Sequence, residues 1–109
     1  MSGYQSDDFL VRRIGEYIGQ FRTEELAEFF ECFADEQRLK ILLALNKEVL
    51  CVADLCAIVK MSQPAVSHHL KKLRENGSVR TEKKGKQIFY SIQDIRIRNL
   101  IEFIEFAET

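Results

Sequence analysis

This sequence lacks several features that would place it in other classes of protein. Tryptophan is absent, proline occurs once and the five glycines do not cluster, so the 109 residues hold no low-complexity linker and indicate one domain, residues 1–109. No uninterrupted apolar run exceeds five residues, far below the length of a membrane span. Three cysteines are an odd count without the spacing of a disulfide scaffold. Because the first residues, MSGYQSDDF, do not resemble a secretory signal, we expect a cytoplasmic protein with reduced thiols.

The formal net charge is only −1, but the positive charge is strongly sorted along the chain. Residues 60–86 hold eight of the sixteen lysines and arginines and two acids, whereas residues 1–59 hold six bases and eleven acids. Such sorting is the electrostatic footprint of a nucleic-acid-binding protein. A charged segment taken alone is more often just solvated, so the order of the elements within it carries the interpretation.

Hydrophobic periodicity predicts helices over the first half of the chain. One helix is expected over about residues 8–20, a second is expected to begin at Thr23, and Asp35 is a suitable N-cap for a third. Three leucines of the third helix are expected to face the core: Leu39, Leu42 and Leu43.

Residues 52–76 have the pattern of a helix-turn-helix. A short helix over about residues 52–59 is followed by a break and by a longer basic helix, for which Ser62 is a good N-cap. Pro64 is tolerated there because the first helical turn has no use for its missing N–H. Gly77 is expected to end the helix in the left-handed conformation. Two short helices around a tight turn predict this motif.

After Gly77 the period changes from that of a helix to that of a strand. Residues 79–83 and 87–92 are predicted strands joined at Lys84-Gly85, which makes residues 79–92 a basic hairpin, or wing. The predicted fold class is therefore mainly α with a small β-hairpin wing, a winged helix-turn-helix.

The last predicted helix, about residues 94–107, is apolar over roughly 220° of its circumference at 100° per residue. One protein surface needs a stripe of about 100°. The excess apolar surface is expected to be buried by another chain.

The outward side of the basic helix is the predicted contact with DNA. Gln63 and Ser67 can pair with base edges, and His68 can donate or accept a hydrogen bond there. His69 lies nearer the inward face, where a packing or hydrogen-bonding role is expected. Lysines and arginines of the helix and the wing suit phosphates. The predicted DNA-binding residues are Ser62, Gln63, Ser67, His68, Lys71, Lys72, Arg74, Lys83, Lys84 and Lys86.

The segments DEQRLKILLAL, CVADLC, MSQPAVSHHLKKLRENG and KKGKQIFYSI are similar to the ArsR/SmtB family of winged-helix repressors. The resemblance covers about residues 26–104. It implies a homodimer built from helices in residues 1–22 and 94–109. It also implies repression of a metal or metalloid resistance operon, with release from DNA when the inducer binds. By this resemblance, Gln63, Ser67 and His68 match positions that read bases.

The same resemblance draws attention to the cysteines. Family members that sense arsenite, antimonite, cadmium or lead carry Cys-Val-Cys-Asp-Leu, whereas this chain has Cys51-Val52-Ala53-Asp54-Leu55-Cys56. The resemblance implies a thiophilic inducer, such as arsenic(III) or antimony(III), on Cys51 and Cys56. A third ligand could come from Cys32, the other protomer, a small thiol or water. The alternative is that these cysteines only fill the core.

Helix geometry limits a site shared by Cys51 and Cys56. On an ideal helix, residues five apart have Cα atoms roughly 8.6 Å apart and differ by about 140° in direction. The two sulfurs can share one ion only if the first helical turn unwinds, and such unwinding would also move the following helix.

The family also has a metal site on its C-terminal helix, which needs an aspartate and a histidine two residues apart. Here Asp94 is followed by Arg96, and a permanent cation cannot ligate a metal. That zinc site is predicted to be absent, and no obligatory cofactor is expected.

Two other functions stay open. The thiols could form a redox or reactive-sulfur switch on the same DNA-binding protein, or the wing lysines could bind an acidic protein partner. An enzyme is not expected, because no nucleophile has a matching base and no phosphate-binding loop occurs in the sequence.

Overall fold

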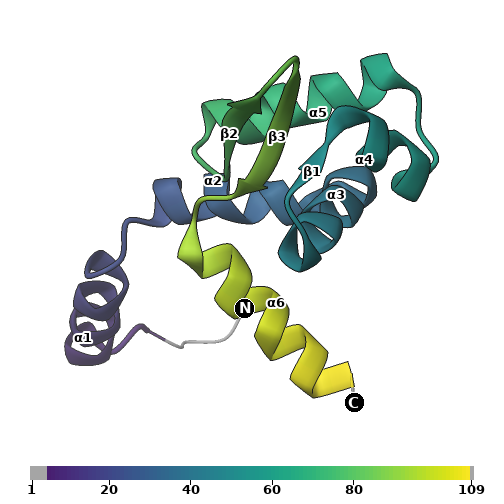
Figure 1. The fold of residues 1–109 in the computed structure, drawn as a ribbon. Coiled ribbons are helices and arrows are strands. Elements are labelled where there is room, and N and C mark those ends of the chain that lie inside the picture. The colour runs from purple at the N-terminus through teal and green to yellow at the C-terminus, as the bar shows by residue number, and fades with distance from the viewer. Residues whose placement is uncertain (1–4, 109) are drawn as a thin grey trace. The chain divides into compact units, whose positions relative to one another are not determined.

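The computed structural model describes residues 5–108, which form six helices and a small three-stranded antiparallel sheet (Figure 1). The chain divides between Phe30 and Glu31 into two compact units. The mainly helical fold class with a small sheet is as predicted. None of the helices within residues 5–108 is long and apolar enough to cross a membrane.

The first unit contains helix α1 (Asp8–Gly19) and most of helix α2 (Thr23–Ala34). Asp7 caps α1 by accepting a hydrogen bond from the backbone N–H of Leu10 at 3.0 Å. Helix α1 buries none of its residues, although one side of it is apolar. The exposed apolar side chains of this helix are Phe9, Leu10, Val11, Ile14, Tyr17 and Ile18. Both helices begin where the sequence predicts.

The second unit begins with the end of α2 and continues into α3 (Glu36–Lys47). The side chain of Asp35 accepts hydrogen bonds from two backbone N–H groups of the first turn, which confirms the predicted cap. Leu42 is buried as predicted and Leu39 is half-buried, but Leu43 is exposed. The prediction for Leu43 is wrong because Ile41 and Leu45, one turn apart, share the buried face with Leu42.

The helix-turn-helix consists of α4 (Val52–Val59) and α5 (Gln63–Glu75), both close to the predicted bounds. Lys60 ends α4 in the left-handed conformation, with φ of 56°. Ser62 caps α5 by accepting a hydrogen bond from the N–H of Ala65 at 3.3 Å, and Pro64 lies in the first turn, as predicted. Gly77, with φ of 81°, follows the end of α5.

The sheet has the strand order β1-β3-β2. Strands β2 (Val79–Lys84) and β3 (Gln87–Ile92) form the predicted hairpin, with Val79 opposite Ile92. The turn lies at Gly85–Lys86, one residue later than predicted, because Gly85 (φ 64°) supplies the positive φ that a two-residue hairpin turn needs at its first central position. The short strand β1 (Leu50–Cys51) pairs with β3 and is not predicted from the sequence.

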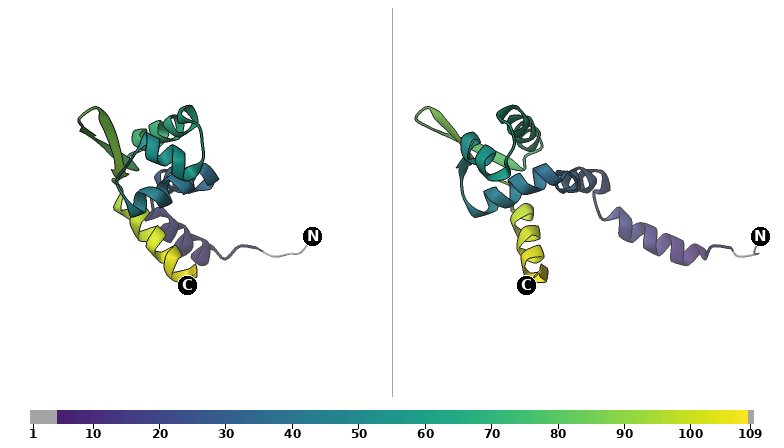
Figure 2. Two further views of the ribbon diagram at one scale, coloured as in Figure 1. Left: turned by 45° about the vertical axis from the view of Figure 1, so that its right-hand side comes forward. Right: turned by 90° about the vertical axis from the view of Figure 1, so that its right-hand side faces the viewer.

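Helix α6 (Ile95–Glu108) follows β3 and extends away from the sheet (Figure 2). Ile97 and Ile101 are buried in the core of the second unit, whereas Phe103 is 68 % exposed. The guanidinium of Arg98 donates to the backbone carbonyl oxygen of Asn46 at 3.3 Å, which ties α6 to the end of α3. The exposed part of the apolar arc is the surface that the sequence predicts to be covered by another chain.

Candidate nucleic-acid interface and thiol pair

Helix α5 is fixed by an apolar face that points into the second unit. Its buried residues are Val66, His69, Leu70 and Leu73. The cap and the six predicted DNA-binding residues of the helix are exposed: Ser62, Gln63, Ser67, His68, Lys71, Lys72 and Arg74. The helix therefore offers short polar side chains near its N-terminus and bases along its later turns, an arrangement that suits a major groove.

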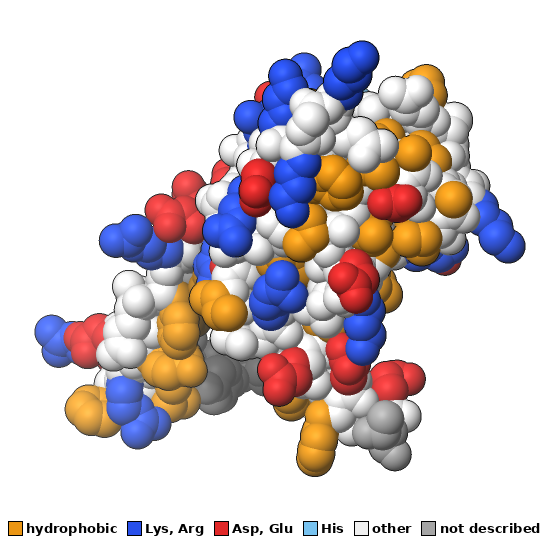
Figure 3. Space-filling model, viewed as in Figure 1, with side chains coloured by type: hydrophobic (Ala, Val, Ile, Leu, Met, Phe, Trp, Pro, Cys, Tyr) orange, Lys and Arg blue, Asp and Glu red, His pale blue; other side chains and the backbone are white. Residues whose placement is uncertain are grey.

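The wing adds a second group of cations. Lys83, Lys84 and Lys86 are exposed around the hairpin turn. Lysine and arginine side chains gather over the tip of β2 and β3, at the top of the space-filling view (Figure 3). The ammonium of Lys84 lies 5.6 Å from the centroid of the Phe89 ring, which holds that cation against the hairpin. Two adjacent elements thus carry the positive charge that the sequence sorts into residues 60–86.

His68 and His69 have different environments, as the sequence predicts. His68 is exposed, whereas the His69 side chain is 9 % exposed and its Nε2 lies 3.0 Å from Oε1 of Gln37 in α3. Because an amide oxygen only accepts, Nε2 carries the proton, and the buried Nδ1 has no partner among residues 5–108. The predicted internal hydrogen-bonding role of His69 is confirmed.

Burial lowers the pKa of His69 below its ordinary value, since a charged imidazolium is poorly solvated there. The carboxylate of Asp35 opposes this shift, and the cations Arg38 and Lys72 add to it. The neutral ring is therefore the form that holds α5 against α3.

Cys51 stands at the junction of the sheet and the helix-turn-helix. It lies in β1 opposite Phe89 and is also the N-cap of α4. Its side chain is 7 % exposed, and its thiol donates to Oδ2 of Asp54 at 3.2 Å. The same carboxylate oxygen accepts the backbone N–H of Cys51 at 3.3 Å. Asp54 is a functional candidate that the sequence reasoning missed, although its position three residues after the N-cap is that of a capping box.

Cys56 is half-buried one turn further along α4, beside a different hollow. That hollow, of about 600 Å³, is lined by Val52, Ala53, Cys56, Ala57 and Gln63. Cys51 lines a hollow of about 300 Å³ on the wing side, with Val52, Ala53, Lys86, Gln87, Ile88 and Tyr90. The two hollows share only Val52 and Ala53. The two sulfurs therefore line different hollows, which meet at Val52 and Ala53.

Cys32 lies in α2 and is engaged in the core of the second unit. Its sulfur is 3.2 Å from Oγ of Ser78 and accepts a hydrogen bond from Nδ2 of Asn76 at 3.0 Å. These contacts tie α2 to the residues that follow α5. No three His, Cys, Asp or Glu side chains within residues 5–108 come together as a metal site.

The predicted obstacle to a C-terminal metal site has a clear geometry. The guanidinium of Arg96 donates to both carboxylate oxygens of Asp94, with Nη2 2.6 Å from Oδ2. This hydrogen bonding lowers the pKa of Asp94 below its ordinary value. The one carboxylate that fits the family pattern is thus already neutralised within its own chain.

Comparisons with known proteins agree with this geometry. Residues 35–81 match the family model described as bacterial regulatory protein, arsR family. The chain is 39 % identical over 100 residues to the cadmium resistance transcriptional regulatory protein CadC of Listeria innocua, covering 90 % of this chain and 84 % of that protein. It is 40 % identical to the transcriptional repressor SmtB homolog of a Synechocystis strain, covering 78 % of this chain and 64 % of that protein.

A solved structure also matches over most of the chain. Reduced HlyU from Vibrio cholerae has a TM-score of 0.74 and 30 % sequence identity, covering 78 % of this chain and 90 % of that one. The relatives named above are regulators of transcription rather than enzymes.

Proposed function

Because this chain belongs to the ArsR/SmtB family of transcriptional regulators, we propose that it represses a resistance operon and leaves its operator when a soft metal or metalloid binds Cys51 and Cys56. It acts in the cytoplasm on double-stranded DNA and needs no resident cofactor. Residues 1–109 work as one DNA-binding domain, in which residues 52–76 are the helix-turn-helix and residues 79–92 the wing.

The placement of α5 is the observation that supports the proposed binding of DNA. Its apolar side is fully used in the core, and the side that remains holds Gln63, Ser67 and His68 next to a row of cations. Gln63 and Ser67 lie one turn apart and can reach base edges, while the cations neutralise phosphates. The exposed lysines of the wing extend this surface beyond α5.

Homodimer formation is supported by apolar surface that one chain leaves exposed. Within residues 5–108, helix α1 buries none of its residues, and α6 leaves Phe103 and Ile104 exposed near its C-terminal end. Apolar faces of this size in a small protein mark an interface. We propose that residues 1–22 and 94–109 of two chains cover one another, which also sets the spacing of two recognition helices on an operator.

The class of inducer is supported by the thiols and by the relatives. One relative is named for cadmium resistance, and another, 44 % identical over 66 residues, is the arsenical resistance operon repressor of Escherichia coli. Cadmium and arsenic(III) both prefer thiolate ligands. Since Cys32 is engaged with Asn76 and Ser78, the third ligand is better sought in the other protomer, a small thiol or water.

Coupling between the thiols and DNA is supported by what surrounds them. The hollow at Cys51 is lined by Lys86 and Gln87 of the wing, and the hollow at Cys56 is lined by Gln63, the first residue of α5. An ion that binds both sulfurs has to draw together two thiols that line different hollows. Such a shift would be transmitted to both DNA-contacting elements and would couple ion binding to release.

Fluorescence anisotropy with the upstream DNA of the protein's own gene tests the proposal. We expect binding at about 50 mM salt that weakens steeply as salt rises, followed by release on adding cadmium or arsenite. If the protein shows no affinity for that DNA at low salt, the result contradicts the proposed repressor function. Cys51→Ser is expected to bind DNA and to ignore the ion. If the serine variant is still released, Cys51 is not part of the inducer site.

A thiol redox switch is the second candidate, favoured by two free cysteines on one short helix and its cap. A mild oxidant in a parallel titration separates the two. Release by oxidant and retention in the presence of metal or metalloid would assign the redox function instead.

A further inference from the structure

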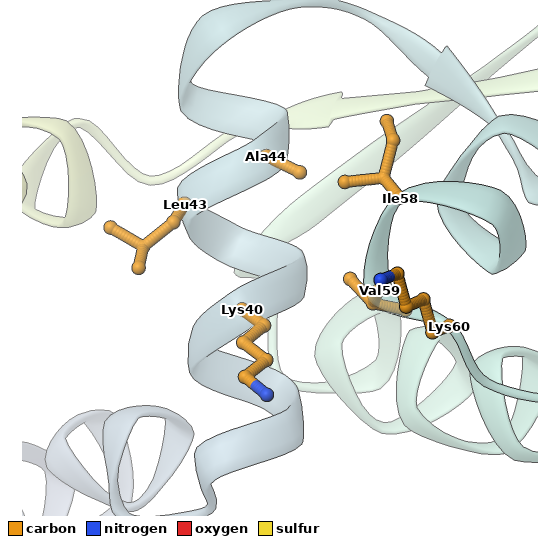
Figure 4. Close-up of a pocket in the computed structure, with 6 residues that line it drawn as sticks. All are labelled: Lys40, Leu43, Ala44, Ile58, Val59 and Lys60. Atoms are coloured by element: carbon orange, nitrogen blue, oxygen red, sulfur yellow. The ribbon is translucent and has the colours of Figure 1, made fainter.

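A hollow between α3 and α4 lies apart from the two hollows beside the thiols. It has a volume of about 420 Å³ and is lined by Lys40, Leu43, Ala44, Ile58, Val59 and Lys60. Figure 4 shows Ala44 and Ile58 facing each other across the space, and the side chain of Lys60 reaching over Val59 toward α3. The volume lies within the range of small-ligand sites, and the lining combines an apolar floor with two cations.

Two apolar side chains that line this hollow are exposed to water. This exposure costs free energy, and the fold of this chain does not explain it. Leu43 is 40 % exposed and Ile58 is 54 % exposed, although both lie beside well-packed core residues. Ile58 belongs to a short helix whose one buried residue is Leu55. An apolar ligand that covers these side chains would remove their surface from water, which is favourable in free energy.

Both charged side chains that line the hollow are lysines, and acidic groups nearby neutralise them only weakly. Lys40 lies 3.6 Å from Glu36 in an exposed pair one turn away, and such pairs contribute little. Lys60 has no acidic partner within 4.0 Å among residues 5–108. A ligand whose carboxylate lies near Lys40 and Lys60 would complement both ammonium groups.

Lys60 also has the one positive φ among non-glycine residues of the described chain. Glycine or asparagine would occupy this left-handed position with less strain. A lysine held there places its cation at the mouth of the hollow, two residues before the cap of α5. Strained residues of this kind often mark a functional position.

From the apolar floor, the two cations and the volume, we propose that the hollow binds a free aliphatic carboxylate of medium chain length. Its hydrocarbon chain lies between Leu43 and Ile58, and its carboxylate lies between the ammonium groups of Lys40 and Lys60. This is a site separate from Cys51 and Cys56, and binding is measured without DNA, so its outcome does not depend on the repressor proposal.

The test is a titration of the full chain with decanoate, followed by amide chemical shifts in ¹H–¹⁵N spectra. Saturable shifts are expected at the residues that line the hollow. Decanol, which lacks the charge, and decyltrimethylammonium, which reverses it, are expected to bind more weakly. Equal affinity for all three compounds, or shifts confined to the exposed apolar sides of α1 and α6, would overturn the proposal, since either result means detergent-like association.

Three variants sharpen the test, and their spectra show directly that each is folded. Lys60→Gln is expected to weaken decanoate binding about threefold, the size of one exposed charge pair. Ile58→Asn is expected to weaken it about tenfold by removing half of the apolar floor. Lys47→Gln, an exposed lysine of α3 that does not line the hollow, is the matched control and should leave the affinity unchanged. Equal losses for Lys47→Gln and Lys60→Gln would mean that only net charge matters.

Discussion

The two helices of the helix-turn-helix are anchored very differently. Helix α5 buries four of its 13 residues and is also held to α3 through His69 and Gln37, whereas α4 buries one of its eight. Yet α4 is the more apolar of the two, and it leaves Ile58 and Ala57 at the surface. The helix that would read DNA is thus anchored by four buried side chains, whereas the helix that carries the candidate sensor is anchored by Leu55 alone. This difference suits a molecule in which a ligand displaces α4 first and acts on α5 through Gln63, which lines the same hollow as Cys56.

The prediction with the largest expected effect tests this comparison by truncating one apolar side chain in each helix. Leu70→Ala in α5 is expected to lower the free energy of unfolding by about 3 kcal/mol, because Leu70 is fully enclosed and its removal leaves a cavity. Ile58→Ala in α4 is expected to cost about 0.5 kcal/mol, because more than half of that side chain is already in water. Urea denaturation measures both. Comparable losses would mean that α4 is as firmly held as α5.

A second prediction concerns what the outward face of α5 reads. His68→Ala is expected to reduce the preference for the operator over random DNA by about 1 kcal/mol, because one base contact is lost while phosphate contacts stay. The matched variant Lys72→Ala should weaken binding to both DNAs equally and lower the salt dependence. Competition anisotropy gives both numbers. If His68→Ala weakens both DNAs alike, His68 contacts the backbone and not a base.

A third prediction concerns the N-terminal end of α4. Asp54→Ala removes the acceptor of the Cys51 backbone N–H and thiol, and is expected to cost about 1 kcal/mol of stability, as loss of a helix cap usually does. Asp54→Asn keeps an oxygen acceptor and is the control. Amide hydrogen exchange should be faster at Cys51 in the alanine variant, with α5 unaffected. Faster exchange throughout α5 would show that the two helices open together.

The smallest expected effect is a pH dependence from His69. Its pKa is lower in the folded chain than the ordinary value of 6.5, so the unfolded chain takes up the proton more readily. The stability contributed by the neutral ring is therefore complete above that pH and is lost as the pH falls below it toward the folded pKa. Thermal unfolding between pH 7.5 and 5 measures the slope, and His69→Gln should reduce it.

Local chemistry explains what the sequence could predict. The bounds of α4, the cap at Ser62 and the stop at Gly77 depend on hydrogen bonds within a few residues, so the sequence pattern contains them. The separation of His68 from His69 needs only the helical period. Two residues proposed to contact DNA, Ser62 and His68, are among these features.

The features that sequence reasoning missed depend on partners far along the chain. Strand β1 has two residues, too few for an alternating pattern, and exists because Phe89 and Tyr90 pair with it. Leu43 is turned out because the packing around Ile41 and Leu45 selects another face of α3. The contact of His69 with Gln37 spans 32 residues. No local propensity indicates such pairings.

Strand β1 has a consequence for the kinetics of sensing. The Cys51 sulfur is almost fully covered while its two-residue strand is paired with β3, and a strand this short separates from its neighbour often by local opening. The rate at which an inducer reaches this sulfur is then set by that opening and not by collision. We expect the observed rate to rise with inducer concentration and to level off at the opening rate. In this molecule, the pairing of two residues of β1 with β3 would set the speed of the response.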